Sequence, residues 1–260
     1  MPQITTDDGV ALNYRLDGPE DAPVLVLSNS LGTDLGMWEP QMPALIQRCR
    51  VLRSDTRGHG QSGLSPAPYQ VDRLGKDVVA LMDALNVSKA LFCGLSMGGM
   101  TGMWLGVHAP DRFTRLVLCN TAAKIGTAEV WNSRIAAVEK GGTDAIVPGV
   151  IQRWFTEGFV KTDPKAVERI AAMLRATKPA GYNAACGAVR DMDQRDSIKA
   201  IRLPTLVIGG THDLSTPPAD SRFVADAIPG ARYVEFPAAH LSNVEVAADF
   251  TRELTGFLAG

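Results

Sequence analysis

The chain has 260 residues, of which 45% are hydrophobic and 21% are charged. This balance is that of a folded globular protein, so an intrinsically disordered chain is excluded. Lys and Arg number 26 and Asp and Glu number 28, which leaves a net charge of −2. No basic stripe runs along the sequence, and we therefore expect no nucleic-acid partner.

The apolar runs and the cysteines indicate the cellular setting. The longest apolar runs, such as residues 24–27, are far shorter than the ~20 residues of a membrane-spanning helix. The first residues lack the cationic and apolar regions of a secretory signal. Cys49, Cys93, Cys119 and Cys186 form no CxxC pair and have no histidine at metal-ligand spacing. We therefore expect a cytoplasmic protein with free thiols, no metal and no membrane partner.

The first part of the chain alternates β-rich runs with an amphipathic run. Strands are predicted over 12–16, 24–28, 51–54, 91–94 and 116–119. A helix is predicted near 72–85, where Leu74, Val78 and Leu81 contribute to one apolar stripe. Strands that alternate with helices indicate βαβ crossovers and a mostly parallel sheet.

The alternation of predicted strands and helices stops in the middle of the chain, where β-rich runs disappear. Helices are predicted near 127–139, 143–157, 164–175 and 181–190. Strands return at 205–208 and 233–236, with helices near 219–227 and after Asn243, the last with an apolar face from Val244 to Phe257. We therefore expect an α/β core of residues 1–121 and 196–260. A helical insertion of residues 122–195, called the cap segment below, is expected to cover its active end.

The most specific chemical signal is a Gly-x-Ser-x-Gly motif centred on Ser96. It follows the apolar run 90–93 and precedes a helix-compatible stretch that reaches Val107. A sharp strand-to-helix turn presents a serine hydroxyl at the helix amino terminus, and the flanking glycines leave room for the neighbouring strand and helix. The structural alternative is a serine that only begins a helix of small residues. The strand-turn-helix context favours a nucleophile.

A serine nucleophile needs a base, and the chain has four histidines. His108 lies on the helix that follows Ser96 and is too near in sequence to reach the hydroxyl. His59 lies in a glycine-rich turn, which accounts for it structurally. His240 follows the strand at 233–236, so it emerges at the carboxyl edge of the sheet, where ligands bind in open α/β sheets. We therefore predict that His240 is the base.

The orienting acid is expected at the same edge. Asp213 follows the strand at 205–208, so neighbouring parallel strands deliver it and His240 from adjacent loops. The chain order Ser96, Asp213, His240 is that of α/β-hydrolases. His212 is the rival base, but its place beside the acid favours an exposed or supporting position.

Acyl transfer also needs hydrogen-bond donors for the oxyanion. One is expected from the backbone N–H of Met97, directly after the nucleophile, and one from the loop after the strand at 24–28. Many relatives have His-Gly in this loop, whereas this chain has Asn29-Ser30, so the second donor is predicted to be the N–H of Leu31. The alternative is a simple strand-to-helix loop.

Together these motifs resemble the α/β-hydrolase superfamily along the whole chain. Further matching segments are Asp-Thr-Arg-Gly-His-Gly-Gln-Ser at 55–62, Gly-Thr-His-Asp-Leu-Ser-Thr-Pro-Pro at 210–218 and Ala-His at 239–240. A narrower resemblance is to 3-oxoadipate enol-lactonases, carried by Ser-Asn-Ser-Leu-Gly-Thr-Asp-Leu-Gly-Met-Trp at 28–38 and Val-Trp-Asn-Ser-Arg-Ile at 130–135.

The narrower resemblance implies a reaction. It implies a serine hydrolase that opens a small anionic enol-lactone to 3-oxoadipate in the β-ketoadipate pathway of aromatic degradation. The triad chemistry proceeds through an acyl-enzyme and requires neither a metal nor an organic cofactor.

Three residues of the cap segment are candidates for substrate binding. Trp131 and Arg134 share the apolar face of the helix near 127–139 with Ile135 and Val138, so a cation lies on that face. Arg134 is expected either to pair with a substrate carboxylate or to lay its methylenes on the cap segment and reach water. Trp131 and Trp154 are candidates for the wall of the substrate pocket. The alternative is the core of the cap segment, and for Trp154 this alternative is favoured.

Other functions are compatible with the same residues. A general carboxylesterase or a cofactor-free perhydrolase uses the same triad, and the fold also hosts small-molecule receptors that turn over slowly. Relatives that act on halides or epoxides carry Asp at the position of Ser96. The sequence does not determine the oligomeric state.

Overall fold

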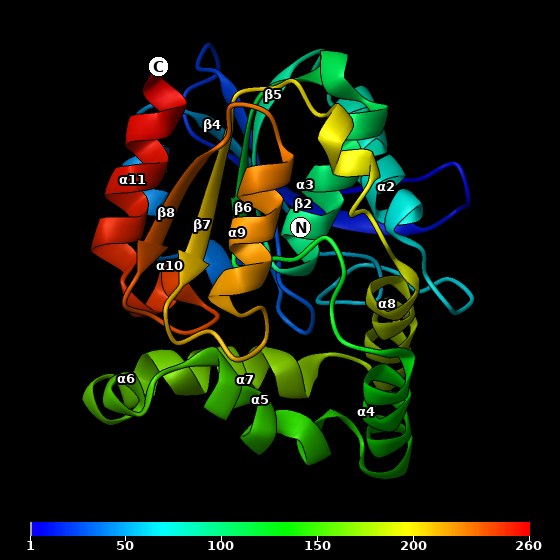
Figure 1. Ribbon diagram of the computed structural model, residues 1–260. Helices are drawn as coiled ribbons and strands as arrows, with labels where there is room; N and C mark the ends of the chain where they lie inside the picture. Colours follow the sequence, from blue (N-terminus) through cyan, green and yellow to red (C-terminus); the bar gives the residue numbers. More distant parts are fainter. Residues whose placement is uncertain (1) are drawn as a thin grey trace.

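A single eight-stranded sheet forms the centre of the protein, as seen in a computed structural model that describes residues 2–260 (Figure 1). The strands are β1 (Gln3–Thr5), β2 (Ala11–Asp17), β3 (Val24–Ser28), β4 (Arg50–Ser54), β5 (Ala90–Leu95), β6 (Phe113–Cys119), β7 (Thr205–Gly210) and β8 (Arg232–Phe236). Their order is β1-β2-β4-β3-β5-β6-β7-β8. Only the pairs β1–β2 and β2–β4 are antiparallel among the described residues. The mostly parallel sheet expected from the sequence is therefore confirmed.

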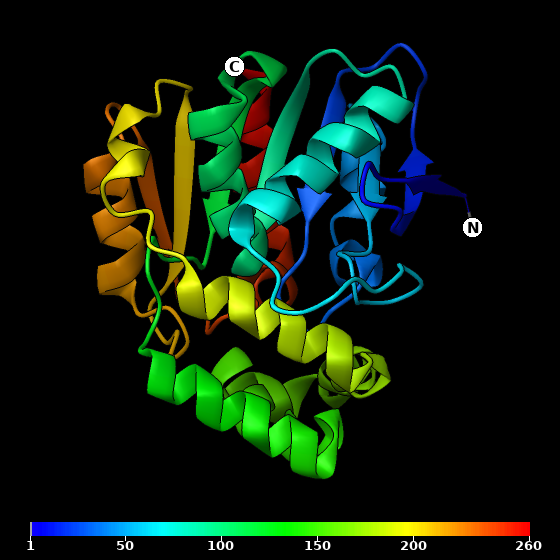
Figure 2. The same cartoon turned by 90° about the vertical axis from the view of Figure 1, so that its right-hand side faces the viewer.

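Helices lie on both faces of this sheet and beyond the carboxyl ends of its strands. They are α1 (Met42–Leu45), α2 (Val71–Ala84), α3 (Met97–His108), α4 (Ala128–Gly141), α5 (Val147–Trp154), α6 (Glu157–Thr162), α7 (Pro164–Ala176), α8 (Pro179–Asp191), α9 (Pro218–Ala227), α10 (Ser242–Glu245) and α11 (Ala247–Ala259). Figure 2 shows α2 and α3 in front of the sheet and α11 behind it. Every residue of β5 and β7 is buried, because these central strands are covered on both sides.

The prediction of one helix over 143–157 was wrong, because the chain there forms a 3₁₀ turn, the helix α5 and the start of the helix α6. A short 3₁₀ turn (Thr143–Ile146) leads into α5, which ends at Trp154. Phe155 is extended, with φ −136° and ψ 147°. The side chain of Thr156 then accepts a hydrogen bond from the N–H of Phe159 and begins α6. An N-cap of this kind favours a new helix over continuation of the previous one.

The carboxyl-terminal helix also differs from the expectation. It is divided at Val246, whose φ of −122° and ψ of 48° are not helical, into α10 and α11. Phe250, Leu254 and Phe257 are buried on α11 as the apolar pattern predicts. The short strand β1, which pairs with β2, was missed because three residues carry too little pattern.

The cap segment runs between β6 and β7 in the chain. Its helices α4 to α8 lie beyond the carboxyl ends of the strands in both views (Figures 1 and 2). Ligands bind at this edge in open α/β sheets, so the fold leaves the site between the sheet and these helices. Across residues 2–260, no helix has the length and apolar character needed to cross a membrane.

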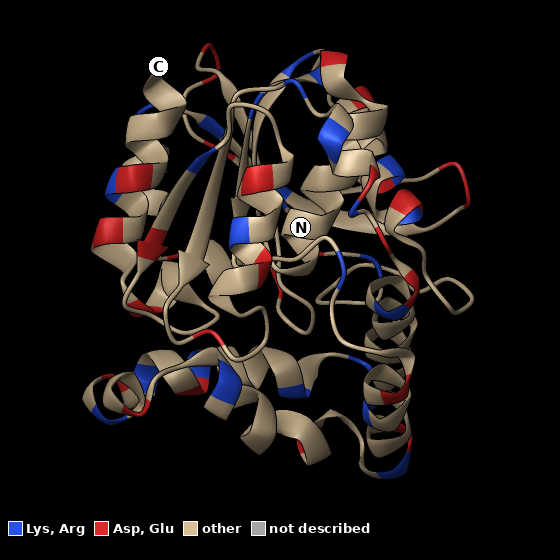
Figure 3. Ribbon diagram, viewed as in Figure 1, with Lys and Arg blue, Asp and Glu red and all other residues tan. Residues whose placement is uncertain are grey.

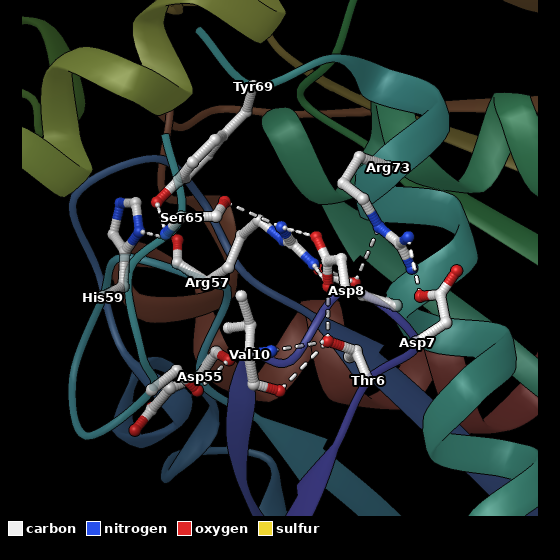
Figure 4. A network of polar contacts seen from close by, with 12 residues as sticks. Thr6, Asp7, Asp8, Val10, Asp55, Arg57, His59, Ser65, Tyr69 and Arg73 are labelled. Atoms are coloured by element: carbon white, nitrogen blue, oxygen red, sulfur yellow. Dashed lines mark hydrogen bonds and ion pairs between the residues drawn. The ribbon is translucent and has the colours of Figure 1, made fainter. Parts of the chain in front are cut away.

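A buried arginine anchors the loop that follows β4. Arg57 is 1% exposed and donates two hydrogen bonds to the carboxylate of Asp77, at 2.6 and 2.7 Å. It also donates to Asp8 and to the hydroxyl of Ser65, each at 2.8 Å (Figure 4). Burial raises the pKa of Asp77, since the charged carboxylate loses its hydration there. The guanidinium is therefore the main group that keeps this carboxylate charged.

Replacing Arg57 with alanine should lower the free energy of unfolding by about 3–5 kcal/mol, because it leaves the buried carboxylate of Asp77 without its main partner. Urea titration followed by circular dichroism measures this loss. Arg73→Ala is the matched control: Arg73 contacts the same carboxylate but is 18% exposed, and its other partner Asp7 is 73% exposed. The control should lose no more than about 1 kcal/mol. Equal losses in the two variants would contradict the role given to burial.

Candidate active site

Ser96 lies on a strained turn between β5 and α3. Its φ of 58° and ψ of −116° fall in a region that side-chain-bearing residues rarely adopt. The turn is held from β6, because the N–H of Ser96 donates to the carbonyl of Cys119 at 2.8 Å. The hydroxyl of Thr121 donates to the carbonyl of Ser96 at 2.8 Å. Backbone strain maintained by its neighbours is typical of a nucleophile on such a turn.

The two glycines of the motif are required by close backbone contacts. A Cβ on Gly94 would lie 2.2 Å from the carbonyl oxygen of Gly98. A Cβ on Gly98 would lie 2.1 Å from the carbonyl oxygen of Ser28 in β3. No side chain fits at either position, so the glycines allow β5, β3 and α3 to meet around Ser96.

His240 and Asp213 come from the loops after β8 and β7 and are directly hydrogen-bonded. Nδ1 of His240 lies 2.8 Å from Oδ2 of Asp213, and both residues are 2% exposed. The carboxylate requires a proton on Nδ1, so Nε2 carries the lone pair that a general base needs. The acid and base predicted from the sequence are thus brought together.

Asp213 is held as a charged carboxylate. Its Oδ1 accepts from the N–H groups of Ser215 and Thr216 at 2.8 and 2.9 Å. Its Oδ2 accepts from the Thr216 hydroxyl and from the amide of Asn120, at 2.8 and 3.1 Å. Burial alone raises the pKa of Asp213, but His240 and these donors outweigh burial and lower it below its ordinary value. Asn120 was missed in the sequence, where its position directly after β6 was the available signal.

The cap segment contacts the loop that carries His240. The N–H of Leu241 donates to the carbonyl of Trp154 at 3.1 Å. The indole of Trp154 lies 6.3 Å from the imidazole of His240 between ring centres. Glu245 accepts hydrogen bonds from the N–H of Ala239 and from the hydroxyl of Thr156, and so joins the two segments. The loop that carries His240 is therefore held by contacts with the cap segment and by Glu245.

The loop after β3 is positioned by buried groups from the loop after β4. The N–H of Gly32 donates to Nε2 of His59 at 3.0 Å, and Nδ1 of His59 lies 3.1 Å from the carbonyl of Arg57. Burial lowers the pKa of His59, which agrees with a neutral ring that accepts at one nitrogen and donates at the other. Asp55 accepts from the N–H of Leu35 at 2.9 Å. These bonds hold the residues that directly follow Leu31 to the loop after β4.

Leu31 and Met97, the predicted oxyanion donors, lie in the loop after β3 and at the start of α3. Leu31 lines the cavity that contains Ser96. Met97 is the first residue of α3, and N–H groups in the first turn of a helix have no acceptor within the helix. The amino terminus of α3 also favours negative charge next to Ser96.

A cavity of about 430 Å³ lies between these residues and the cap segment. Ser96 and His240 line it, and so do Trp131, Arg134 and Trp154, the three candidates from the cap segment. The cavity is also lined by residues that were not predicted as site residues, namely Ser30, Ile125, Gly126, Val130, Arg153, Tyr182, Leu214 and Ser215. A mostly apolar pocket with a few convergent polar groups is typical of a small-molecule site.

Two arginines give this cavity a positive character. The guanidinium of Arg134 lies 4.9 Å from the ring centre of Trp131. Arg153, at the end of α5, lines the same cavity and was missed because no pattern marked the orientation of that short helix. Burial raises the pKa of Tyr182, so its phenol stays protonated beside Arg134. Both cations are available to an anionic ligand.

The remaining histidines lie outside this arrangement. His108 stacks on Trp104 at 4.5 Å between ring centres. His212, the rival base, is exposed. Among residues 2–260, no three His, Cys, Asp or Glu side chains are grouped closely enough to hold a metal ion.

Positive and negative residues are interspersed over the visible helices (Figure 3). In this view, no face of the molecule is covered by residues of one charge.

Comparisons with known proteins agree with this geometry. The family described as "alpha/beta hydrolase fold" matches residues 23–246. The chain is 43% identical to 3-oxoadipate enol-lactonase 2 of Acinetobacter baylyi, over 93% of this chain and 90% of the relative. It is 41% identical to 3-oxoadipate enol-lactonase 1 of the same species, over 98% and 96%. The crystal structure of the enol-lactonase from Burkholderia xenovorans LB400 superposes with a TM-score of 0.98, 46% identity and 100% of both chains covered.

These matches extend over the core and the cap segment alike. They confirm the fold and the resemblance inferred from the motifs around Ser96. The chain belongs to the α/β-hydrolase family, in which 3-oxoadipate enol-lactonases are among its similar relatives.

Proposed function

We propose that this protein is a serine hydrolase that opens 3-oxoadipate enol-lactone to 3-oxoadipate in the β-ketoadipate pathway. The observation that carries the proposal is that His240, which is hydrogen-bonded to Asp213, lines the same cavity as Ser96 and two arginines. The names of the relatives support the same substrate. The reaction needs no metal or organic cofactor.

The acylation step starts at Ser96. Nε2 of His240 takes the hydroxyl proton while Oγ attacks the lactone carbonyl, and Asp213 stabilises the imidazolium that forms. The N–H groups of Leu31 and Met97 bind the oxyanion of the tetrahedral intermediate. The bond between the carbonyl carbon and the ring oxygen then breaks. The leaving group is an enolate, which takes the proton from the His240 imidazolium and becomes the ketone, so that His240 is neutral again.

Deacylation repeats the same proton transfers with water. His240 removes a proton from a water molecule, whose oxygen attacks the acyl carbon, and Ser96 leaves with the proton returned by His240. The product carries two carboxylates, one present in the substrate and one formed by hydrolysis.

Trp131 and Trp154 are proposed to form walls of the substrate pocket.

Arg134 is proposed to bind the carboxylate of the substrate. Arg134→Gln should raise KM for the anionic lactone about 10- to 100-fold, since a hydrogen bond to a charged group contributes about 1.5–3 kcal/mol. Steady-state kinetics measure this change. Arg190→Gln, on α8, is the control, because Arg190 is paired with Asp191 and does not line the cavity. An unchanged KM for the lactone in Arg134→Gln would contradict the proposed contact.

A direct assay tests the function as a whole. Freshly generated enol-lactone is followed spectrophotometrically beside a neutral nitrophenyl ester. An enol-lactonase should turn over the lactone with the higher kcat/KM. A higher kcat/KM on the neutral ester would indicate a general carboxylesterase. Faster reaction of the acyl-enzyme with peroxide than with water would indicate a perhydrolase. A single turnover would indicate a receptor.

The setting of the reaction is part of the same proposal. The four cysteines are buried and free, which supports a cytoplasmic location. The position of α4 to α8 beyond the strand ends supports a covering role for residues 122–195 over the core of residues 1–121 and 196–260.

A further inference from the structure

Ser30, directly before Leu31, has a buried hydroxyl without a hydrogen-bond partner. The residue is 1% exposed, and its Oγ contacts no donor or acceptor among residues 2–260. Four other residues also leave one buried side-chain atom unpaired, namely Arg53, Asn183, Gln194 and Asn243. Each of those bonds through a second side-chain atom. A serine has no second atom, so the whole polar group of Ser30 is unsatisfied.

A buried hydroxyl without a hydrogen-bond partner has a cost in free energy. It has lost its hydrogen bonds to water and has gained none from the protein, which destabilises the free protein. Such groups are rare in native structures, and a partner that is present only at another stage of function is one explanation. Ser30 lines the cavity with Ser96 and His240, so a bound reactant is an available partner.

The sheet register places Ser30 and Ser96 just beyond the same end of two neighbouring strands. Strands β3 and β5 are parallel, with Ser28 opposite Gly94 at the end of the pairing. Ser30 and Ser96 each follow that pair by two residues, and both line the cavity. Leu31, the proposed oxyanion donor from this loop, is the next residue. The unpaired hydroxyl therefore lies at the edge of the cavity where the oxyanion is expected.

We propose that Ser30 is a catalytic residue whose Oγ–H donates a third hydrogen bond to the oxyanion, beside the N–H groups of Leu31 and Met97. No covalent bond to Ser30 forms or breaks. Its proton stays on Oγ while negative charge develops on the carbonyl oxygen and disappears when the intermediate collapses. The proposal rests on the acyl-enzyme chemistry of the proposed function, and any ester that acylates Ser96 meets the same donor.

Kinetics of Ser30→Ala test the proposal. We expect kcat/KM to fall about 100-fold, the lower end of the effect of removing one oxyanion donor, through kcat rather than KM. The fall should be equal for the enol-lactone and for a nitrophenyl ester, because both form the oxyanion. Ser30→Thr, which keeps the hydroxyl, should recover most of the activity. The midpoint of thermal unfolding should not fall in Ser30→Ala, because no hydrogen bond within the protein is lost.

Thr205→Val is the matched control. Thr205 is also buried, but its hydroxyl donates to the carbonyl of Leu203 at the amino end of β7, away from the cavity. This variant should lose thermal stability and keep kcat. Ser30→Ala is expected to show the opposite pattern, which a merely structural role for Ser30 would not produce.

A transition-state analogue gives a second readout. A short alkylboronic acid forms a tetrahedral adduct with the nucleophilic serine, and its inhibition constant should rise in Ser30→Ala by the same factor as kcat/KM falls. A loss restricted to the lactone, or unchanged kinetics and boronate inhibition, would overturn the proposal. If the wild-type enzyme hydrolyses the ester but not the lactone, the proposed function fails and the ester kinetics alone decide the role of Ser30.

Discussion

Replacing Ser96 with alanine should lower kcat for the enol-lactone by about 10⁶-fold, the effect seen when the nucleophile of a serine hydrolase triad is removed. No other hydroxyl in the cavity can replace it, because only Ser96 lies on the strained turn at the amino terminus of α3. The remaining oxyanion donors and binding contacts give a small residual rate. Stopped assays with high enzyme concentration measure it.

The fold should survive this change. The hydrogen bonds that hold the turn run through the backbone N–H and C=O of Ser96, which alanine keeps. Ser96→Gly should also be inactive but more stable than Ser96→Ala by about 1–3 kcal/mol, because glycine tolerates the positive φ of 58°. Ser88→Ala, which alters an exposed serine outside the cavity, should keep its activity. Near-normal turnover by Ser96→Ala would remove Ser96 from the mechanism.

Asp213→Asn should lower kcat about 10⁴-fold while the protein stays folded. The carboxylate accepts five hydrogen bonds, including one from Nδ1 of His240 at 2.8 Å. An amide in its place presents an N–H₂ group to some of these donors. If that group faces His240, the proton moves to Nε2, and the imidazole cannot accept the proton of Ser96.

Asp220→Asn is the matched control for this prediction. Asp220 lies on α9, where its pKa is raised by partial burial and by the charge of Asp213, but it has no hydrogen bond to His240. Its replacement should leave kcat within about two-fold. A comparison of kcat for the two variants under the same conditions decides between a specific role of Asp213 and a general effect of negative charge. Equal activity in both would contradict the specific role.

Much of the fold and the catalytic order was predictable from short segments. The glycines on either side of Ser96 indicate close backbone contacts, since a Cβ at either position would overlap a neighbouring main chain. Asp213 and His240 follow apolar runs that read as strands, and parallel strands end at one edge. One failed prediction depended on a distant residue. The helix expected over 143–157 is broken where Thr156 caps a new helix against Glu245, a residue 89 positions away.

The sequence by itself determined the α/β class, the nucleophile turn and the order of acid and base, because each depends on neighbours within a few residues. Tertiary structure alone decided which groups face the substrate. Ser30, Asn120 and Arg153 acquire their significance from what lies across the sheet or the cavity. Whether a buried hydroxyl or carboxylate has a hydrogen-bond partner depends on atoms from distant segments. A pattern of neighbouring residues does not show which distant segments come together.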